Sequence, residues 1–300
     1  MLRQFSGNER KYLLPLSDGL TWEFRAAESM TTWLKDFSYI MQISRASDDM
    51  NEADKKLLFL ALKHDNKLPE TDSTEDWNQF KQGAVYRVWS HNHKPETFIE
   101  LNSDFIHHQE IKIINMSTSL KPIYKHYTLH NRGGPIHAAL AELNGKGILI
   151  AAHGGTGKST CSIRFPNYWT PLSDDMSLIV SDSDSNYRVH PMPTWSDHLW
   201  NKKMSTFNTS YSVPLKAIFF LEQSDVDEIL PIRNPQNSQK IFDSFKQVWE
   251  SFWPKIDVTE KKIMVHKIFN NAFDISCKIP CYKLKATLHG EFWKEIEKAI

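Results

Sequence analysis

The sequence predicts a mixed α/β protein, and three of its features indicate this fold class. Hydrophobic residues make up 40% of the 300 residues, enough to bury a sizeable core. Segments in which apolar residues alternate, as in β-strands, are interspersed with segments that have the apolar spacing of helices. A glycine-rich loop also lies between a short apolar run and a short helical segment, as in many α/β proteins.

Charge and hydropathy exclude several classes of partner. Lysine plus arginine and aspartate plus glutamate number 36 each, so no net field attracts nucleic acid or an anionic membrane surface. The longest apolar runs, such as 148–152 and 217–221, are far shorter than the about 20 residues that cross a bilayer. The N-terminus lacks the features of a secretory signal, and three cysteines cannot form a disulfide framework. We therefore expect a cytoplasmic protein with no nucleic-acid and no membrane partner.

Residues 1–130 are predicted to form an N-terminal α+β region. Alternating apolar residues favour strands, 3.6-residue spacing favours helices, and a polar stretch favours a surface loop. The expected elements are strands at 21–26 and 84–90, helices at 28–43 and 52–65, and a loop at 67–76. No motif in this region indicates its role.

Residues 131–300 are predicted to form a second domain, beginning at the break Arg132-Gly133-Gly134-Pro135. Strands at 136–143 and 148–152 are joined by Asn144-Gly145, the signal for a tight hairpin. The remaining expected elements are a helix at 159–165 that Pro166 ends, strands at 170–180 and 187–192 around a turn at 181–186, a strand at 217–223, helices at 236–253 and 257–273, a strand at 282–288 and a helix at 291–300.

The segment AHGGTGKS, residues 152–159, has the character of a phosphate-binding loop. Glycines let consecutive backbone N–H groups point inward around an oxyanion. Lys158 would reach the β- and γ-phosphates of a nucleotide, and the Ser159 hydroxyl would coordinate Mg²⁺. Ala152 departs from the motif, which has glycine there. The residues expected to hold the nucleotide are Gly154, Gly155, Thr156, Gly157, Lys158, Ser159 and Thr160.

An acidic pair, Asp174-Asp175, follows Lys158 by only 16 residues. That length allows one short helix, one turn and the start of a strand, which would bring the pair back beside the phosphate loop. Two adjacent carboxylates at a strand end can divide two roles, because one can bind a metal while the other accepts the proton of an attacking hydroxyl. The alternative is a solvated turn without chemistry.

These motifs together resemble a known family. IHAALAELNGKGILIAAHGGTGKST followed by PLSDD resembles the HPr kinase/phosphorylase family, whose core is similar to that of ATP-dependent phosphoenolpyruvate carboxykinase. With HPMPTWSD, VPLKAIFFLEQ and LHGEFW, the sequence is similar to the HPr-kinase-like ScmC proteins of SynChlorMet cassettes, which are associated with ribosomally made, modified peptides. The resemblance covers residues 132–192 well and 213–300 loosely, and it implies a phosphoenolpyruvate carboxykinase/HPr kinase-like core.

The resemblance also implies roles for individual residues. Lys158 would be the phosphate ligand and Ser159 a magnesium ligand. Asp174 would be the general base towards a substrate hydroxyl, and Asp175 the metal partner. His137 would border the catalytic site, although the residues alone favour a packed strand histidine.

The expected function is therefore an ATP- and Mg²⁺-dependent kinase whose acceptor is a serine or threonine hydroxyl on a peptide or small protein. Thr160 stands where HPr kinases have glutamate, and their C-terminal signature for the protein substrate is missing, which argues against HPr as the acceptor. Two alternatives remain open: a non-catalytic nucleotide-binding module of a peptide-modifying complex, and a simple NTPase. Related kinases that form rings imply a homo-oligomer by analogy only.

Overall fold

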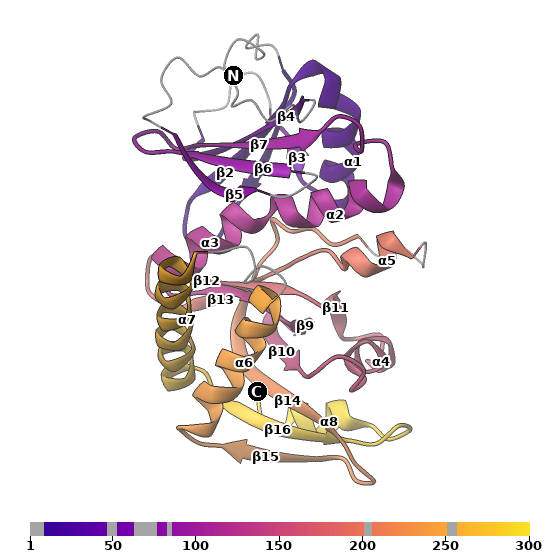
Figure 1. The fold of residues 1–300 in the computed structure, drawn as a ribbon. Coiled ribbons are helices and arrows are strands. Elements are labelled where there is room, and N and C mark those ends of the chain that lie inside the picture. Colours follow the sequence, from indigo (N-terminus) through magenta and orange to yellow (C-terminus); the bar gives the residue numbers. More distant parts are fainter. Residues whose placement is uncertain (1–8, 47–52, 63–76, 83–85, 201–205, 251–256) are drawn as a thin grey trace. The chain divides into compact units, whose positions relative to one another are not determined.

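The computed structural model describes residues 9–46, 53–62, 77–82, 86–200, 206–250 and 257–300. It has a mixed α/β fold, as the sequence predicts, and the chain divides into two compact units (Figure 1). Unit 1 comprises residues 1–122 and 195–210, and unit 2 comprises residues 123–194 and 211–300. No helix in the described part of the chain is both long enough and apolar enough to span a bilayer.

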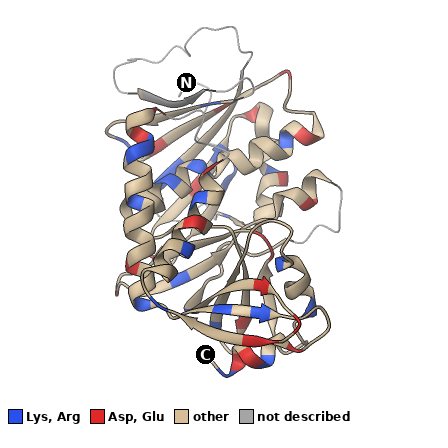
Figure 2. Cartoon of the chain, turned by 60° about the horizontal axis from the view of Figure 1, so that its bottom comes forward, with Lys and Arg blue, Asp and Glu red and all other residues tan. Residues whose placement is uncertain are grey.

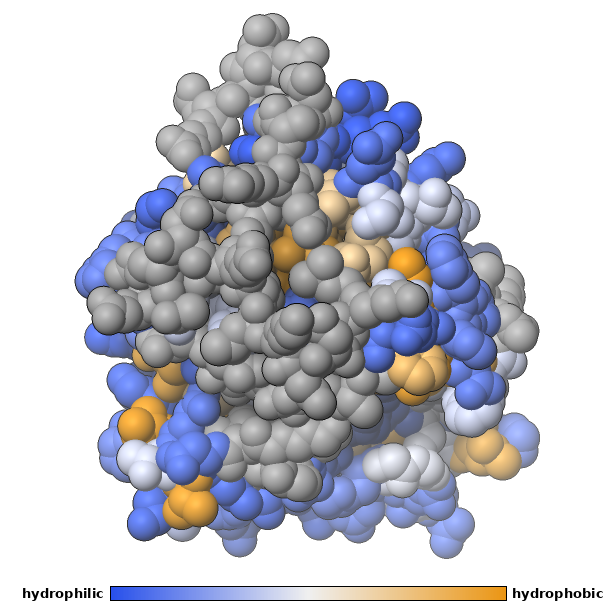
Figure 3. All heavy atoms as spheres, turned by 45° about the horizontal axis from the view of Figure 1, so that its top comes forward, coloured by the Kyte–Doolittle hydropathy of each residue, from blue (hydrophilic) through white to orange (hydrophobic). Residues whose placement is uncertain are grey.

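Charged residues are dispersed along the chain (Figure 2), and hydrophobic residues are dispersed on the one face that Figure 3 shows. Figure 2 shows basic and acidic residues interspersed along the described helices and strands, in agreement with their equal numbers in the sequence. On the face drawn in Figure 3, hydrophobic residues form separate patches among hydrophilic ones. Recognition therefore has to come from local arrangements of residues rather than from a broad field.

Unit 1 is built on a seven-stranded sheet with the order β3-β1-β2-β4-β7-β6-β5. Its central strands β2, β4 and β7 are parallel neighbours, and the outer pairs are antiparallel. The strands are β1 (Lys11–Pro15), β2 (Thr21–Ala26), β3 (Ser44–Arg45), β4 (Lys55–Leu62), β5 (Trp77–Gln82), β6 (Tyr86–His91) and β7 (Glu96–Asn102). The helices are η2 (Glu28–Met30), α1 (Thr31–Met41), α2 (Gln109–Ser119) and α5 (Trp195–Leu199).

An aromatic core joins α1 to the sheet of unit 1. The rings of Phe24 and Phe37 lie 5.5 Å apart, and those of Trp33 and Phe59 lie 5.0 Å apart. All four side chains are buried. The strand predicted at 21–26 and the helix predicted within 28–43 are confirmed.

The helix predicted at 52–65 is wrong, because residues 55–62 of this segment form β4, while residue 52 and residues 63–65 lie outside the described residues. Leu57, Leu58, Phe59 and Leu60 are each at most 4% exposed, since β4 lies in the middle of the sheet between two parallel strands. A strand buried on both faces has no alternation of polar residues, so periodicity does not distinguish it from a buried helix. The predicted loop at 67–76 lies outside the described residues, and the strand predicted at 84–90 corresponds to β6.

Unit 2 contains a nine-stranded sheet. Seven strands follow the order β11-β9-β10-β14-β13-β12-β8, and the sheet branches at β14, where β16 pairs with β14 on one side and with β15 on the other. The neighbours β10, β14 and β16 are parallel. The strands are β8 (Gly134–Ile136), β9 (Ala138–Leu143), β10 (Lys146–Ala151), β11 (Thr170–Ser173), β12 (Ser177–Ser181), β13 (Tyr187–Pro191), β14 (Val213–Gln223), β15 (Glu228–Ile232) and β16 (Cys281–Ala286). The helices are α3 (Lys121–His130), α4 (Lys158–Arg164), α6 (Gln236–Glu250), α7 (Val258–Lys278) and α8 (Phe292–Glu297).

Most predicted elements of unit 2 are confirmed, including the hairpin between β9 and β10. Its turn residues Asn144 and Gly145 have φ angles of 52° and 75°, the left-handed conformation that Asn-Gly turns adopt readily.

An aromatic cluster packs the helices of unit 2 onto the sheet. Phe165 stacks on Trp169 with ring centroids 4.6 Å apart, and its ring centroid lies 5.3 Å from that of Phe292 of α8. These rings belong to one buried cluster that packs α4 and α8 against the sheet.

The single strand predicted at 170–180 is wrong, because the structure divides it into β11 and β12. Ser173 of β11 pairs with Leu140 of β9, whereas Ser177 of β12 pairs with Ile136 of β8. Since β9 and β8 lie towards opposite ends of the sheet path, the chain has to bend between the two strands. This acidic bend, defined as residues 174–176, contains the aspartate pair.

Candidate active site

The loop after β10 is tightly curled, and two of its glycines adopt backbone conformations that favour glycine. Gly155 and Gly157 have φ angles of 79° and 110°, in the left-handed region that favours glycine. The Thr156 N–H donates to the His153 carbonyl at 3.3 Å, which closes a turn inside the loop. Gln223 of β14 donates to the Thr156 carbonyl at 3.2 Å and ties the loop to the neighbouring parallel strand.

Lys158 is the buried cation of this loop, with 6% of its surface exposed. Its Nζ donates to the Ala152 carbonyl at 2.7 Å and lies 2.8 Å from Nε2 of His137. The contact to Ala152 uses a backbone oxygen, so an alanine in place of the motif's first glycine still provides it. In the described part of the chain, the hydrogen-bond partners of Lys158 are thus a backbone oxygen and a ring nitrogen.

His137 and the acidic bend meet because two strand breaks coincide. His137 is the single residue between β8 and β9, and the acidic bend separates β12 from β11. Ser177 pairs with Ile136 on one side of the breaks, and Ser173 pairs with Leu140 on the other. Strand pairing therefore places residues 137–139 opposite residues 174–176. Nδ1 of His137 lies 3.5 Å from Oδ1 of Asp175.

Buried hydroxyl groups support the acidic bend from beneath. The Oγ atoms of Ser173 and Ser177 lie 2.9 Å apart, and Ser177 donates to the Ala138 carbonyl at 3.1 Å. Both serines are fully buried. On the other side, the His137 N–H donates to the Ser244 carbonyl of α6 at 3.1 Å. These bonds fix the positions of the histidine and the bend before any ligand binds.

Burial controls the protonation of the two basic groups. Burial lowers the pKa of His137; the Asp175 carboxylate opposes this shift, and the charge of Lys158 adds to it. Burial likewise lowers the pKa of Lys158, and Asp175 again opposes the shift. With its pKa below the ordinary 6.5, the His137 ring is neutral at pH 7, so Nε2 can accept a hydrogen bond from Lys158 while Nδ1–H faces Asp175.

Residues 100–300 match the family model of the SynChlorMet cassette protein ScmC, which covers about two thirds of the chain. The chain belongs to the ScmC family. No curated protein is significantly similar to it. The matched region includes the loop, His137 and the acidic bend of this ScmC family member, and it excludes most of unit 1.

The structure brings together three of the residues predicted for the site: Lys158, His137 and Asp175. Asp174 is half-buried in the same acidic bend, and Ser159 and Thr160 are exposed on the first turn of α4. Sequence reasoning missed the supporting residues. They are Ser173, Ser177, Gln223 and Ser244, which have no motif of their own, so only the strand register reveals them.

The site contains oxygen donors of the type that Mg²⁺ prefers. Within the described ranges, no group of three or more histidine, cysteine, aspartate and glutamate side chains could hold a metal. Mg²⁺ is usually held by one or two carboxylates together with substrate phosphates and water, rather than by an all-protein cage. The Asp175 carboxylate and the Ser159 hydroxyl supply donors of this hard type in the ScmC chain, one on the acidic bend and one on α4.

Proposed function

We propose that this ScmC family member is an HPr kinase-like phosphotransferase that uses ATP and Mg²⁺ to phosphorylate a serine or threonine hydroxyl on a peptide or small protein. The observation that supports the proposal most is the buried Lys158 amine, held within 3 Å of both the loop backbone and His137. A cation buried without a carboxylate hydrogen-bonded to it is suited to an anionic ligand.

Lys158 has a donor available for a phosphate oxygen. An ammonium group has three N–H donors, and its two described partners occupy two of them. The N–H groups of the curled loop would hold the remaining phosphate oxygens. When Mg²⁺ is bound, it would neutralise charge on the transferring phosphoryl group, with Asp175 and Ser159 as its protein ligands.

Asp174 is the proposed general base. Its carboxylate would take the proton of the acceptor hydroxyl while the acceptor oxygen forms a bond to the γ-phosphorus and the bond from that phosphorus to the β,γ-bridging oxygen breaks, releasing ADP. His137 would keep Lys158 in place through Nε2 and face Asp175 through Nδ1. The residues therefore act mainly by positioning charges around the phosphoryl group.

The acceptor and the setting also belong to this proposal. The family is named for a SynChlorMet cassette, and this name supports our inference that the acceptor is a peptide encoded in such a cassette. A kinase of this type would work in the cytoplasm, where ATP is available. Assembly into a homo-oligomer stays a prediction by analogy.

Transfer of label from γ-labelled ATP to the co-encoded peptide tests the proposal. The unaltered protein should label the peptide, and Asp174→Asn should lower transfer by about 10²- to 10⁴-fold while ATP still binds. Lys158→Ala should weaken both binding and transfer. Asp184→Asn, in the exposed turn between β12 and β13, is the matched control and should transfer normally.

Other outcomes would replace the proposal. Phosphate release that does not depend on a peptide would identify a simple NTPase. ATP binding with neither transfer nor hydrolysis would identify a non-catalytic nucleotide-binding module. Transfer at the normal rate by Asp174→Asn would show that the assigned base is wrong.

A further inference from the structure

A cavity of about 790 Å³ lies beside the phosphate loop in unit 2, away from His137 and the acidic bend. Thr156, Gly157 and Thr160 form its wall on the side of the loop. Leu221 of β14 and Ala286 of β16 line it from the sheet, and the exposed Leu288 lies at its rim. Its volume is in the range of about 300–1,000 Å³ that is usual for small-molecule sites.

The cavity is built where three parallel strands end. The phosphate loop follows β10, a loop beginning at Ser224 follows β14, and a loop beginning at Thr287 follows β16. In open α/β sheets, ligands bind outside the carboxyl ends of parallel strands, because the loops there converge. The cavity thus occupies the usual ligand-binding edge of the sheet and shares that edge with the phosphate loop.

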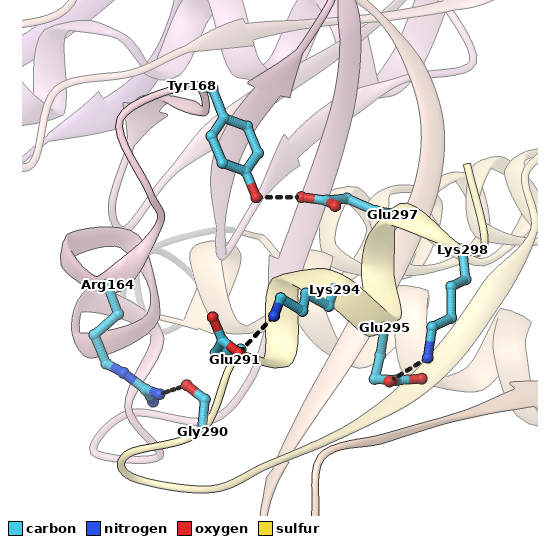
Figure 4. Close-up of polar contacts among 8 residues, drawn as sticks. All are labelled: Arg164, Tyr168, Gly290, Glu291, Lys294, Glu295, Glu297 and Lys298. Carbon is cyan, nitrogen blue, oxygen red and sulfur yellow. Dashed lines mark hydrogen bonds and ion pairs between the residues drawn. The ribbon is translucent and has the colours of Figure 1, made fainter.

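Hydrogen bonds hold the loops around this cavity in place. The Ser224 N–H donates to the Ala286 carbonyl at 3.1 Å, and the Thr287 N–H donates to the Asp227 carboxylate at 2.6 Å. Arg164 of α4 donates to the carbonyls of Thr287, at 2.7 Å, and Gly290. Figure 4 shows the Arg164 side chain directed at Gly290, where the chain enters α8. The cavity is therefore formed before a ligand arrives.

The chemistry of the lining suits an uncharged group with polar edges. The guanidinium of Arg164 donates to two carbonyl oxygens, and the Asp225 carboxylate also lies at the lining, so the positive charge of the lining is balanced by a negative one. Leu221, Ala286 and Leu288 offer apolar surface. Burial raises the pKa of Cys161 to about 11, so this lining thiol stays protonated and contributes an apolar wall.

The direction of the loop decides what the cavity would hold. Lys158 points to the side of His137 and Asp175, and in a phosphate loop this lysine contacts the β- and γ-phosphates. The backbone N–H groups of the loop would hold the phosphates that are nearer the nucleoside. The nucleoside would therefore lie on the side of the loop that is opposite to His137 and Asp175. On the premise that the proposed function is correct, we infer that this cavity is the nucleoside site and takes the base and ribose of the nucleotide.

The test compares the binding of ATP with that of inorganic tripolyphosphate, both with Mg²⁺, by isothermal titration calorimetry on the full chain. Tripolyphosphate reaches the loop but has nothing to place in the cavity. We expect ATP to bind at least about tenfold more tightly to the unaltered protein, because of the extra apolar contact.

Two variants locate the gain in affinity. Ala286→Phe fills the cavity and should weaken ATP binding by about tenfold or more, with tripolyphosphate unaffected. Leu288→Ala alters an exposed residue, so it leaves the fold intact, and it should weaken ATP binding about fivefold. Ile163→Ala is the matched control, because Ile163 is 83% exposed on α4, a helix that lines the cavity, but Ile163 itself is not part of the lining.

The outcomes separate this inference from the proposed function. If tripolyphosphate binds but ATP binds no more tightly, or if Leu288→Ala behaves like Ile163→Ala, the nucleoside site is wrong while the phosphate loop stands. If neither ligand binds, the proposed function fails and the nucleoside site fails with it.

Discussion

The two units each bury a cation to the same extent but give it different partners. Arg87 in unit 1 and Lys158 in unit 2 are both 6% exposed. Arg87 Nε lies 2.9 Å from a carboxylate oxygen of Glu100, which is itself fully buried. Lys158 instead contacts the Ala152 carbonyl and the His137 ring.

The difference in partners distinguishes Arg87, whose charge has a structural role, from Lys158, whose charge is suited to binding a ligand. The Arg87–Glu100 pair joins β6 to β7, so each charge is neutralised within the sheet. Asp175 is near enough to oppose the lowering of the Lys158 pKa, but it contacts His137. Among the described residues, no carboxylate is hydrogen-bonded to Lys158, and we expect an anionic ligand to bind this cation.

The largest effect on stability is expected from breaking the pair in unit 1. Arg87→Met removes the guanidinium from the buried Glu100 and should lower the free energy of unfolding by about 3–5 kcal/mol. Lys158→Met loses two hydrogen bonds but also removes the cost of burying a charge, so it should change that free energy by less than about 1 kcal/mol. Urea unfolding monitored by circular dichroism measures both.

The double variant Arg87→Met/Glu100→Leu is the control for this comparison. Replacing both members of a buried ion pair with apolar groups is often neutral, so stability should be largely recovered. If Lys158→Met destabilises the protein as much as Arg87→Met, the two charges have the same role and the distinction between the units is wrong.

A smaller effect is expected from the pH dependence of His137. Because burial lowers its pKa in the folded state below 6.5, the unfolded state binds more protons just below pH 6.5. Stability from this residue is therefore complete above pH 6.5 and is lost as the pH falls towards the folded-state pKa. The slope is at most about 1.4 kcal/mol per pH unit. Urea unfolding from pH 7.5 to 5 should show this decline, and His137→Gln should make it smaller by the contribution of this residue.

His198 provides the matched control in unit 1. Burial also lowers the pKa of His198, and Asp197 opposes the shift. The His198→Gln variant should therefore lose its own contribution and keep that of His137. An unchanged pH dependence in His137→Gln would contradict the assignment of a neutral ring that accepts from Lys158.

Local chemistry allowed much of unit 2 to be predicted from the sequence. Asn144-Gly145 specifies a hairpin turn, and Pro166 ends a helix, because both act through the backbone of a few residues. The prediction for residues 52–65 failed, because an apolar run of this kind suits either a helix or a strand that is buried on both faces. Only the pairing of β4 with β2 and β7 decides between the two. The division between β11 and β12 likewise depends on pairing partners far away in the sequence.

The candidate site was predictable where a motif names its residues. Lys158 and the aspartate pair follow from the loop and its spacing, and His137 follows from the family resemblance. The contacts that hold these residues together could not be predicted from the sequence, because a buried serine pair and a backbone carbonyl of α6 have no motif in a single sequence. Asp175 lies against His137, whereas the division of roles between Asp174 and Asp175 stays a prediction.

The smallest effect on stability is expected from removing the Ser177 hydroxyl, an uncharged group whose hydrogen bonds hold the acidic bend in place. Ser177→Ala removes the bond to the Ala138 carbonyl and the contact with Ser173, so the free energy of unfolding should fall by about 1 kcal/mol. Because Ser177 lies below the bend and does not contact Lys158, ATP affinity should be unchanged while the rate of phosphoryl transfer falls.

Urea unfolding, ATP titration and the transfer assay on the same sample test this separation. Ser183→Ala, in the exposed turn between β12 and β13, is the matched control and should change none of the three. A loss of ATP affinity in Ser177→Ala comparable to that in Lys158→Ala would mean that the bend and the loop act as one unit. The bend would then help to bind the nucleotide, and the neutral hydroxyl pair would belong to the binding site for the anion together with the buried cation.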